Sequence, residues 1–200
     1  MLFWRFGALT WFSNKKAIVS MSETSASAQN AMNRLWETHV GSEFTHKNTD
    51  ETLATMTDNP RVTIVPTMIG GQGLEEMRTF YSTHFLNQLP PDLEIVPISR
   101  TIGESRVVDE LVLRFTHSMT MDWVLPGIPA TGQRIEFAMV VVVHIEGDKI
   151  ASENIYWDNA TILRQAGLLA DPKLPVLGAE SARNMIEPAP LNELIRRPAP

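Results

Sequence analysis

The pattern of hydrophobic and polar positions changes once along the chain, from helical spacing to strict alternation. Apolar residues recur at spacings of three and four through residues 28–46, and Thr49 to Met56 continues as a short second helix. Arg61 to Val65 then alternates as a short strand, and Leu74 to Phe85 is a third, amphipathic helix. The helices are therefore concentrated before residue 90.

From residue 94 onward, alternating positions predict a meander of antiparallel strands. The expected strands are Glu94 to Ile102, Arg106 to Val124, Arg134 to Glu146 and Lys149 to Asp158, and a short helix follows at Thr161 to Leu169. A straight strand from Arg106 to Trp123 would be about 60 Å long, so this strand has to bend or bulge. The expected fold class is therefore α+β: a cone-shaped, strongly curved, mostly antiparallel sheet that is covered by N-terminal helices.

Both ends of the chain depart from this pattern. Residues 1–20 are basic, aromatic and free of acid, which is typical of a mitochondrial leader or of a mis-called start with true translation from Met21. The last 30 residues are rich in proline, which permits neither a helix nor a central strand, apart from one helical turn near Ala179 to Ile186. The expected organisation is a disordered leader at 1–27, a packed domain at 28–170 and a proline-rich C-terminal arm at 171–200.

The composition excludes several classes of protein. The 200 residues include no cysteine, so disulfides, thiolate nucleophiles and cysteine-ligated metals are ruled out, and a cytoplasmic location is expected unless residues 1–20 are a mitochondrial leader. The formal charge of −6 argues against a nucleic-acid surface. The longest apolar run, Phe137 to Val143, is too short to span a membrane.

Two local patterns resemble cofactor or metal motifs but do not match them. The glycine-rich segment Gly70 to Gly73 precedes a helix, yet a dinucleotide fingerprint would need a third glycine where Glu76 stands, so a flexible loop is expected. His39, Glu43 and His46 share one face of a helix, but their spacing does not match the H-E-x-x-H zinc motif. We expect solvated or helix-capping roles for them, with neither a metal nor a cofactor.

The last strand carries the richest polar cluster in the chain. Strand alternation places Asn154, Tyr156 and Asp158 on one face, and a two-residue turn before this strand would set Asp158 opposite Phe137 on the apolar face. A carboxylate in an apolar cavity has a raised pKa and becomes a competent acid or base near neutral pH. The alternative is that Asp158 caps the helix that follows it.

His117 lies among apolar residues on one face of the long strand, so its ring needs either a hydrogen-bonding partner in the core or a ligand. The remaining substrate-binding candidates are Asn154 and the residues expected to line the cavity. The latter are Trp36, Tyr81, Phe115, Met119, Met121, Trp123, Phe137 and Met139.

A set of short motifs lies together in the C-terminal half of the domain. They are Gly127-Ile-Pro129-Ala-Thr131-Gly132-Gln133-Arg134, Gly147-Asp148-Lys149-Ile150, Tyr156-Trp157-Asp158 and Gln165-Ala166-Gly167. In this combination the chain resembles the SnoaL-like polyketide cyclase family, within the nuclear transport factor 2-like superfamily, over residues 28–170.

The resemblance implies an α+β cone that forms a homodimer or homotetramer and uses no cofactor. It also implies that Asp158 is the acid/base of an intramolecular aldol closure, assisted by a histidine at position 144. Strand alternation sets His144 on the face opposite Asp158, so His117 or Tyr156 is the expected partner. Glu153 and His39 are further candidates.

The predicted function is that of a cofactor-independent cyclase or isomerase of a hydrophobic, polyketide-like or terpenoid intermediate in secondary metabolism. Asp158 would remove a proton α to a carbonyl, while Tyr156, His117 or Asn154 stabilises the enolate by a hydrogen bond. The same fold also permits a non-catalytic module that binds a small ligand or a protein, a lactone or ester hydrolase, and a dehydratase.

Overall fold

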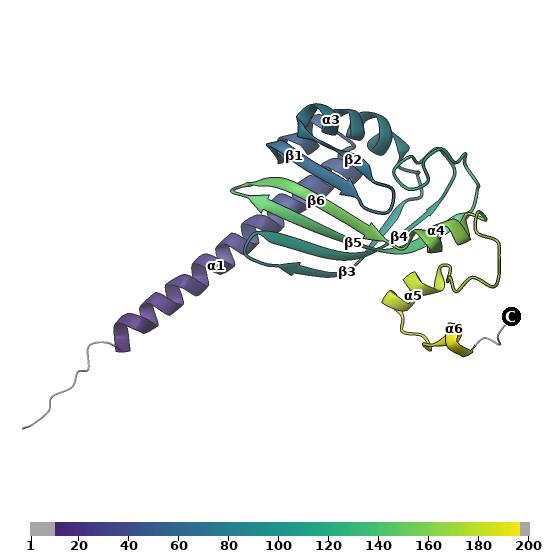
Figure 1. The fold of residues 1–200 in the computed structure, drawn as a ribbon. Coiled ribbons are helices and arrows are strands. Elements are labelled where there is room, and N and C mark those ends of the chain that lie inside the picture. Colours follow the sequence, from purple (N-terminus) through teal and green to yellow (C-terminus); the bar gives the residue numbers. More distant parts are fainter. Residues whose placement is uncertain (1–10, 197–200) are drawn as a thin grey trace, which may run out of the picture.

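The computed structural model describes residues 11–196, with side chains from Ser25 onward, and its first element is one long helix (Figure 1). Helix α1 (Trp11–Val40) passes directly into a π-helical segment, η1 (Gly41–His46). Helix α2 (Thr49–Ala54) begins at Asn48, whose side chain accepts hydrogen bonds from two backbone N–H groups of the first turn. The predicted second helix is therefore confirmed, although it ends at Ala54 rather than at Met56.

The predicted boundaries at the N-terminus differ from the structure. Residues 11–27, which we expected to be disordered, belong to α1, and the N-terminal part of this helix projects away from the sheet (Figure 1). Residues 1–10 lie outside the described part of the chain. The choice between Met1 and Met21 as the start, and the division into leader, domain and arm, stay predictions.

A hairpin and a helical segment follow α2. Strand β1 (Met56–Ile64) pairs with β2 (Ile69–Gln72), and the chain continues through α3 (Gly73–Thr79), the π-helical η2 (Phe80–Phe85) and η3 (Leu86–Gln88). The glycine-rich segment is therefore strand β2 rather than a flexible loop. Gly70 is required there, because a Cβ at this position would lie 2.0 Å from the backbone oxygen of Val62.

The second half of the chain forms the long strands. These are β3 (Glu94–Ile102), β4 (Arg106–Thr116), β5 (Arg134–Glu146) and β6 (Lys149–Trp157), followed by α4 (Asn159–Gln165), α5 (Glu180–Ile186) and α6 (Glu193–Arg196). Strand β4 ends at Thr116 instead of continuing to Val124. His117 donates its backbone N–H to Gln133 and closes residues 118–132 into a connection.

The six strands form one sheet in the order β2-β1-β6-β5-β4-β3, in which only β1 and β6 run parallel. Helices α1 and α3 pack against one face of this sheet, where the hydrophobic core lies (Figure 1). The C-terminal arm lies against the other face, where Arg183 of α5 forms a bidentate ion pair with Glu136 of β5. The predicted α+β class, with helices over a mostly antiparallel sheet, is confirmed.

A β-bulge in the last hairpin reverses the predicted orientation of β6. Glu146 pairs with Lys149 across the expected two-residue turn, but Ala151 has no partner, because Ile150 pairs with Ile145 and Ser152 with His144. A one-residue insertion moves every following side chain to the opposite face. From Glu153 onward, the odd-numbered residues of β6 therefore face the core, and the predicted apolar placement of Asn154, Tyr156 and Asp158 is wrong.

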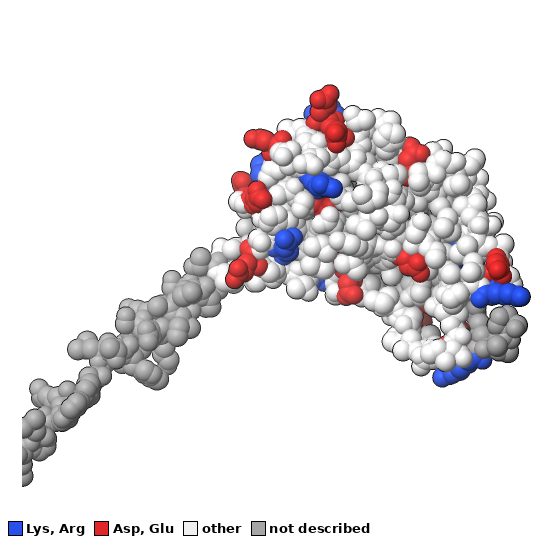
Figure 2. Space-filling view, viewed as in Figure 1, with Lys and Arg blue, Asp and Glu red and all other residues white. Residues whose placement is uncertain are grey.

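The surface carries acidic and basic side chains that are interspersed. On the face shown in Figure 2, charged side chains of the described residues are scattered over largely uncharged surface, and several lie next to a side chain of opposite charge. Among residues 11–196, no helix combines the length and the apolar character needed to cross a membrane.

Candidate active site

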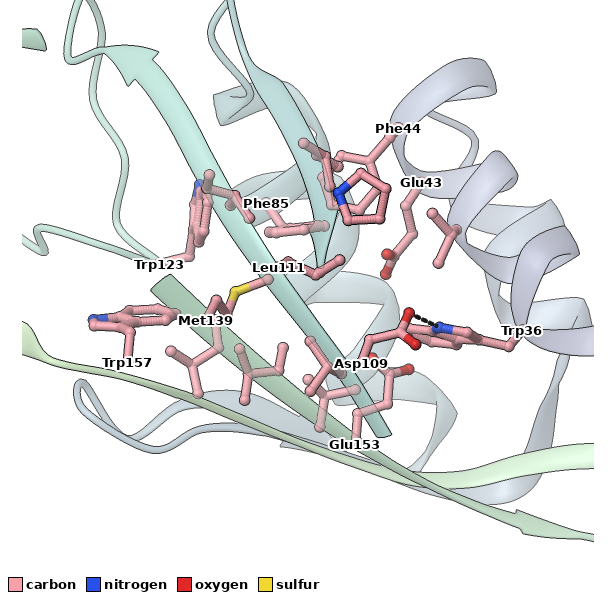
Figure 3. Close-up of a pocket in the computed structure, with 18 of the residues that line it drawn as sticks. Trp36, Glu43, Phe44, Phe85, Asp109, Leu111, Trp123, Met139, Glu153 and Trp157 are labelled. Carbon is pink, nitrogen blue, oxygen red and sulfur yellow. Dashed lines mark hydrogen bonds between the residues drawn. The ribbon is translucent and has the colours of Figure 1, made fainter. Parts of the chain in front are cut away.

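A cavity of about 300 Å³ lies between the sheet and the helices that cover it. Most of its wall is apolar and aromatic, and Trp123, Trp157 and Met139 lie toward one end (Figure 3). The polar wall residues Trp36, Glu43, Tyr81, Arg100, Asp109 and Glu153 complete the lining. Figure 3 shows Trp36, Glu43, Asp109 and Glu153 together at the opposite end. An apolar chamber with polar groups at one end is typical of a site for a small hydrophobic molecule.

Behind this polar end, the buried ring of His39 lies between two buried carboxylates. Its Nε2 is 3.2 Å from Glu43 Oε1 and 3.0 Å from Glu153 Oε1. Glu43 is four residues after His39, one helical turn further on, whereas Glu153 reaches the ring from β6 because of the bulge at Ala151. We refer to His39, Glu43 and Glu153 as the carboxylate–histidine cluster.

The hydrogen bond at Nδ1, the other ring nitrogen of His39, shows which nitrogen keeps its proton. Its Nδ1 is 2.6 Å from Thr55 Oγ1, and the Thr55 hydroxyl donates its own proton to the backbone oxygen of Thr52 at 2.6 Å. Thr55 must therefore accept from Nδ1–H, so Nδ1 is protonated and Nε2 is the position that exchanges protons with the two carboxylates.

Burial and charge give the members of the cluster different protonation states. Burial alone would lower the pKa of His39, but the carboxylates of Glu153 and Glu43 outweigh it and raise this pKa from 6.5 to about 10. Burial raises the pKa of Glu43, although the His39 charge opposes the increase. Near neutral pH His39 is therefore an imidazolium, and burial favours the protonated form of Glu43.

Tyr81 contributes a hydroxyl group to the same site. Its oxygen is 3.4 Å from His39 Nε2, and its side chain is buried. Burial and the two carboxylates of Glu153 and Glu43 raise the pKa of Tyr81 well above 10, so it remains a neutral hydrogen-bond donor.

A second polar group borders the cavity beside the cluster. The carboxylate of Asp109 accepts hydrogen bonds from the indole Nε1 of Trp36 at 2.7 Å and from two nitrogens of Arg100, each at 2.7 Å. The Trp36 ring also stacks on His39, with centroids 5.4 Å apart.

The ligand atoms of the carboxylate–histidine cluster lie within 4.8 Å of one another, a spacing that a metal ion could bridge. However, the imidazolium already supplies the positive charge between the carboxylates. We therefore interpret the cluster as an ion-paired acid/base group.

The structure places the predicted acid/base residue Asp158 outside the cavity. Asp158 is exposed and accepts hydrogen bonds from the backbone N–H of Ala160 and from the Thr161 hydroxyl, so it caps α4. Tyr156 is 43% exposed on the outer face of the sheet. His144 of β5 also faces outward, so the bulge in β6 brings Tyr156 onto the same face as His144. The charged partner of His144 is Glu146. The structure therefore supports the capping interpretation of Asp158.

The other predicted contact residues divide between the cavity, the core and the outer face. Trp36, Tyr81, Trp123 and Met139 line the cavity. Phe115, Met121 and Phe137 are buried in the core outside the cavity lining, Met119 is half-buried, and Asn154 lies on the outer face. His117 is buried, and its Nδ1 contacts Thr131, so it does not line the cavity.

Sequence reasoning missed Glu43, Arg100 and Asp109 as site residues. The expectation that His39 and Glu43 are solvated is wrong for both, although His46 does lie at the surface beside Glu51. One signal was available: Trp36 precedes His39 by three residues on the same apolar helical face, which indicates that His39 points into the core.

Comparisons with known proteins agree with this architecture. The model of the SnoaL-like polyketide cyclase family matches residues 26–166. No curated protein sequence matches the chain significantly.

Three solved structures illustrate the fold. A candidate SnoaL-like polyketide cyclase from Jannaschia sp. CCS1 has a TM-score of 0.55 at 19% identity and aligns over 70% of this chain and 94% of its own. TsrD from Streptomyces laurentii has a TM-score of 0.54 at 19% identity, over 70% and 97%. An NTF2-like protein of unknown function from Burkholderia pseudomallei K96243 has a TM-score of 0.52 at 18% identity, over 68% and 97%. Because the family model covers most of the sequence, the chain belongs to the SnoaL-like polyketide cyclase family.

Proposed function

We propose that the protein is a cofactor-independent cyclase or isomerase, which uses Glu153 as the base and Glu43 as the acid on a small hydrophobic, polyketide-like substrate. The observation that carries this proposal is the pair of buried carboxylates at the polar end of an apolar cavity, both in contact with one imidazolium. Burial favours the protonated form of Glu43, which suits this residue to the role of the acid.

The reaction that suits this pair is an aldol closure or a proton shift α to a carbonyl. Glu153 takes the α-proton, and the resulting enolate attacks a second carbonyl group of the same molecule to form a carbon–carbon bond. Glu43 gives its proton to the new alkoxide oxygen, so the product is an isomer of the substrate. The neutral hydroxyl of Tyr81 supplies a further hydrogen-bond donor to the developing negative charge.

The arrangement also explains how the site is reset. Glu153 ends the reaction protonated and Glu43 ends it ionised, and both contact the same nitrogen of His39. The proton can therefore return from Glu153 to Glu43 through Nε2, without water in the cavity.

The test uses exchange of the α-protons of 2-tetralone, an uncharged bicyclic ketone, in D₂O followed by ¹H NMR. The wild-type protein should accelerate the exchange, and Glu153→Gln should slow it by about 100-fold or more, as expected for loss of a general base. Asp158→Asn is the matched control, because it likewise replaces one carboxylate by an amide but lies outside the cavity, at the junction of β6 and α4.

Two outcomes would contradict the proposal. Loss of exchange in Asp158→Asn with retention in Glu153→Gln would return the base to the position that the family resemblance implies. Tight binding of 2-tetralone by the wild-type protein without any exchange would favour a non-catalytic binding module.

A further inference from the structure

Asp109 is a buried carboxylate that the proposed reaction does not use. It projects from β4 toward the cavity and is only 3% exposed. Arg100 Nε donates to its Oδ1, while Arg100 and the indole of Trp36 both donate to its Oδ2, each at 2.7 Å. These three hydrogen bonds engage both oxygens of Asp109, so the carboxylate is held in a fixed orientation.

The indole held by Asp109 is the ring that covers His39. Trp36 and His39 are three residues apart on α1, and their rings stack with an interplanar angle of 16° and centroids 5.4 Å apart. Both side chains are buried. The face of an indole carries partial negative charge and attracts a cation within about 6 Å of the ring, so Trp36 stabilises the imidazolium over the neutral imidazole.

The Trp36 indole links Asp109 to the ring of His39. The charged or titratable groups that face His39 directly are Glu43 from η1, Glu153 from β6 and Tyr81 from η2. If Asp109→Asn, which lacks the charge, leaves the His39 ring unchanged, an effect of Asp109→Leu on that ring is evidence for the contact with Trp36.

Asp109 and Arg100 together connect three elements of the fold. Arg100 belongs to β3 and Asp109 to the neighbouring β4, and a further nitrogen of Arg100 contacts Asn33 and Glu37 of α1 at 2.8 and 3.4 Å. These contacts connect the sheet edge to the helix that carries Trp36 and His39. The hydrogen bond to Asp109 therefore fixes the Trp36 indole relative to the sheet.

We propose that Asp109 is a positioning residue, which holds the Trp36 indole against His39 and thereby keeps the carboxylate–histidine cluster charged and oriented for proton transfer. This inference deepens the proposed function and rests on it for the reaction. The contacts among Asp109, Trp36 and His39 can nevertheless be tested without a substrate.

The test is an NMR titration of the His39 ring in the full-length protein, with the signal assigned from His39→Gln. Asp109→Leu removes the acceptor for the indole, and Trp36→Leu removes the aromatic face. Each should lower the pKa of His39 by about one unit, the size expected for a buried cation–π contact. The double variant should lower it no further, because both changes remove one interaction.

Two variants separate anchoring from a general effect of charge. Asp109→Asn retains an oxygen that can accept from the indole, so it should titrate close to the wild-type protein. Glu37→Gln removes a negative charge on the far side of Arg100 and should also leave His39 unchanged. In Asp109→Leu, the pH at which 2-tetralone exchange is half-maximal should move in step with the His39 titration.

The inference is overturned if Asp109→Asn lowers the pKa as much as Asp109→Leu does, or if Asp109→Leu acts while Trp36→Leu does not. If Asp109→Leu fails to fold, Trp36→Phe provides the same comparison, because it keeps an aromatic ring but has no N–H for Asp109. A shifted titration without exchange activity in the wild-type protein would overturn the proposed function alone.

Discussion

At the scale of single residues, His39 connects the stability of the protein to its chemistry. An imidazole in an apolar interior would normally lose its charge, but Glu43 and Glu153 keep it protonated to a pKa of about 10. In the unfolded chain the same ring would be protonated only below its ordinary value of 6.5. Folding therefore takes up a proton at His39 between these two pH values.

This proton uptake makes stability depend on pH. Because the native pKa is the higher one, the stabilising contribution of His39 is complete below pH 6.5 and is lost as the pH rises toward about 10. We expect the free energy of unfolding of the wild-type protein to fall in that window by up to about 1.4 kcal/mol per pH unit. Urea denaturation at intervals between pH 6 and 10 measures it. A slope that persists unchanged in His39→Gln would assign the effect to other groups.

At the scale of secondary structure, one unpaired residue determines which side chains reach the cavity. The turn before β6 has the predicted two residues, and strand β5 has the predicted limits. Within this hairpin, the bulge at Ala151 is the feature that differs from the expectation. It places Glu153 beside His39 and turns Tyr156 outward, so a correct prediction of the turn and of β5 still assigned the wrong face of β6 to the site.

Deletion of Ala151 tests the register that this bulge sets. Without Ala151, Ile150 would still pair with Ile145 and Ser152 with His144, so the hairpin becomes regular and Glu153 keeps its place on the core face. We therefore expect the deletion to keep most of its stability, whereas Glu153→Gln, which removes a charged partner of the buried His39, should lose several kcal/mol of unfolding free energy. Thermal unfolding followed by circular dichroism measures both changes. A deletion that is as unstable as Glu153→Gln would contradict the prediction.

At the scale of the whole molecule, the two faces of the sheet have different partners. Helix α1 and the segments η1 and η2 enclose the cavity on one face, whereas the C-terminal arm covers part of the other. The arm is attached through Ala182, which is fully buried, and through the ion pair of Arg183 with Glu136. The predicted homodimer or homotetramer, which would use surface outside the cavity, stays a prediction.

Because the arm and the cavity lie on opposite faces of the sheet, we expect that the arm can be detached without disrupting the cavity. Ala182→Asp would bury a carboxylate near Glu136, so α5 should detach and unfold, and trypsin should then cleave the peptide bond after Arg183, whose side chain is already exposed, more readily. We expect faster cleavage after Arg183 and an unchanged rate of 2-tetralone exchange. Ser181→Ala, at the preceding half-buried position, is the control for cleavage. A large loss of exchange in Ala182→Asp would show that the arm supports the cavity.

The sequence by itself determined the parts of this protein that depend on neighbouring residues. Helical spacing predicted the C-terminal part of α1 and helix α2, and alternation predicted strands β3 and β5 with the limits that the structure has. The set of motifs between residues 127 and 167 identified the family, which the match over residues 26–166 shows. These signals are local, so they can be read from a single chain.

Only the tertiary structure decided which polar residues form the candidate site. His39 and Glu153 are separated by 114 positions in the sequence, and they meet because a bulge shifts β6 by one residue. Asp109 likewise reaches Trp36 across 73 positions. The period of a strand is two residues, so a one-residue change that follows no local rule exchanges its faces. A buried charge needs a partner that is close in space, and the order of residues along the chain does not show which residue that partner is.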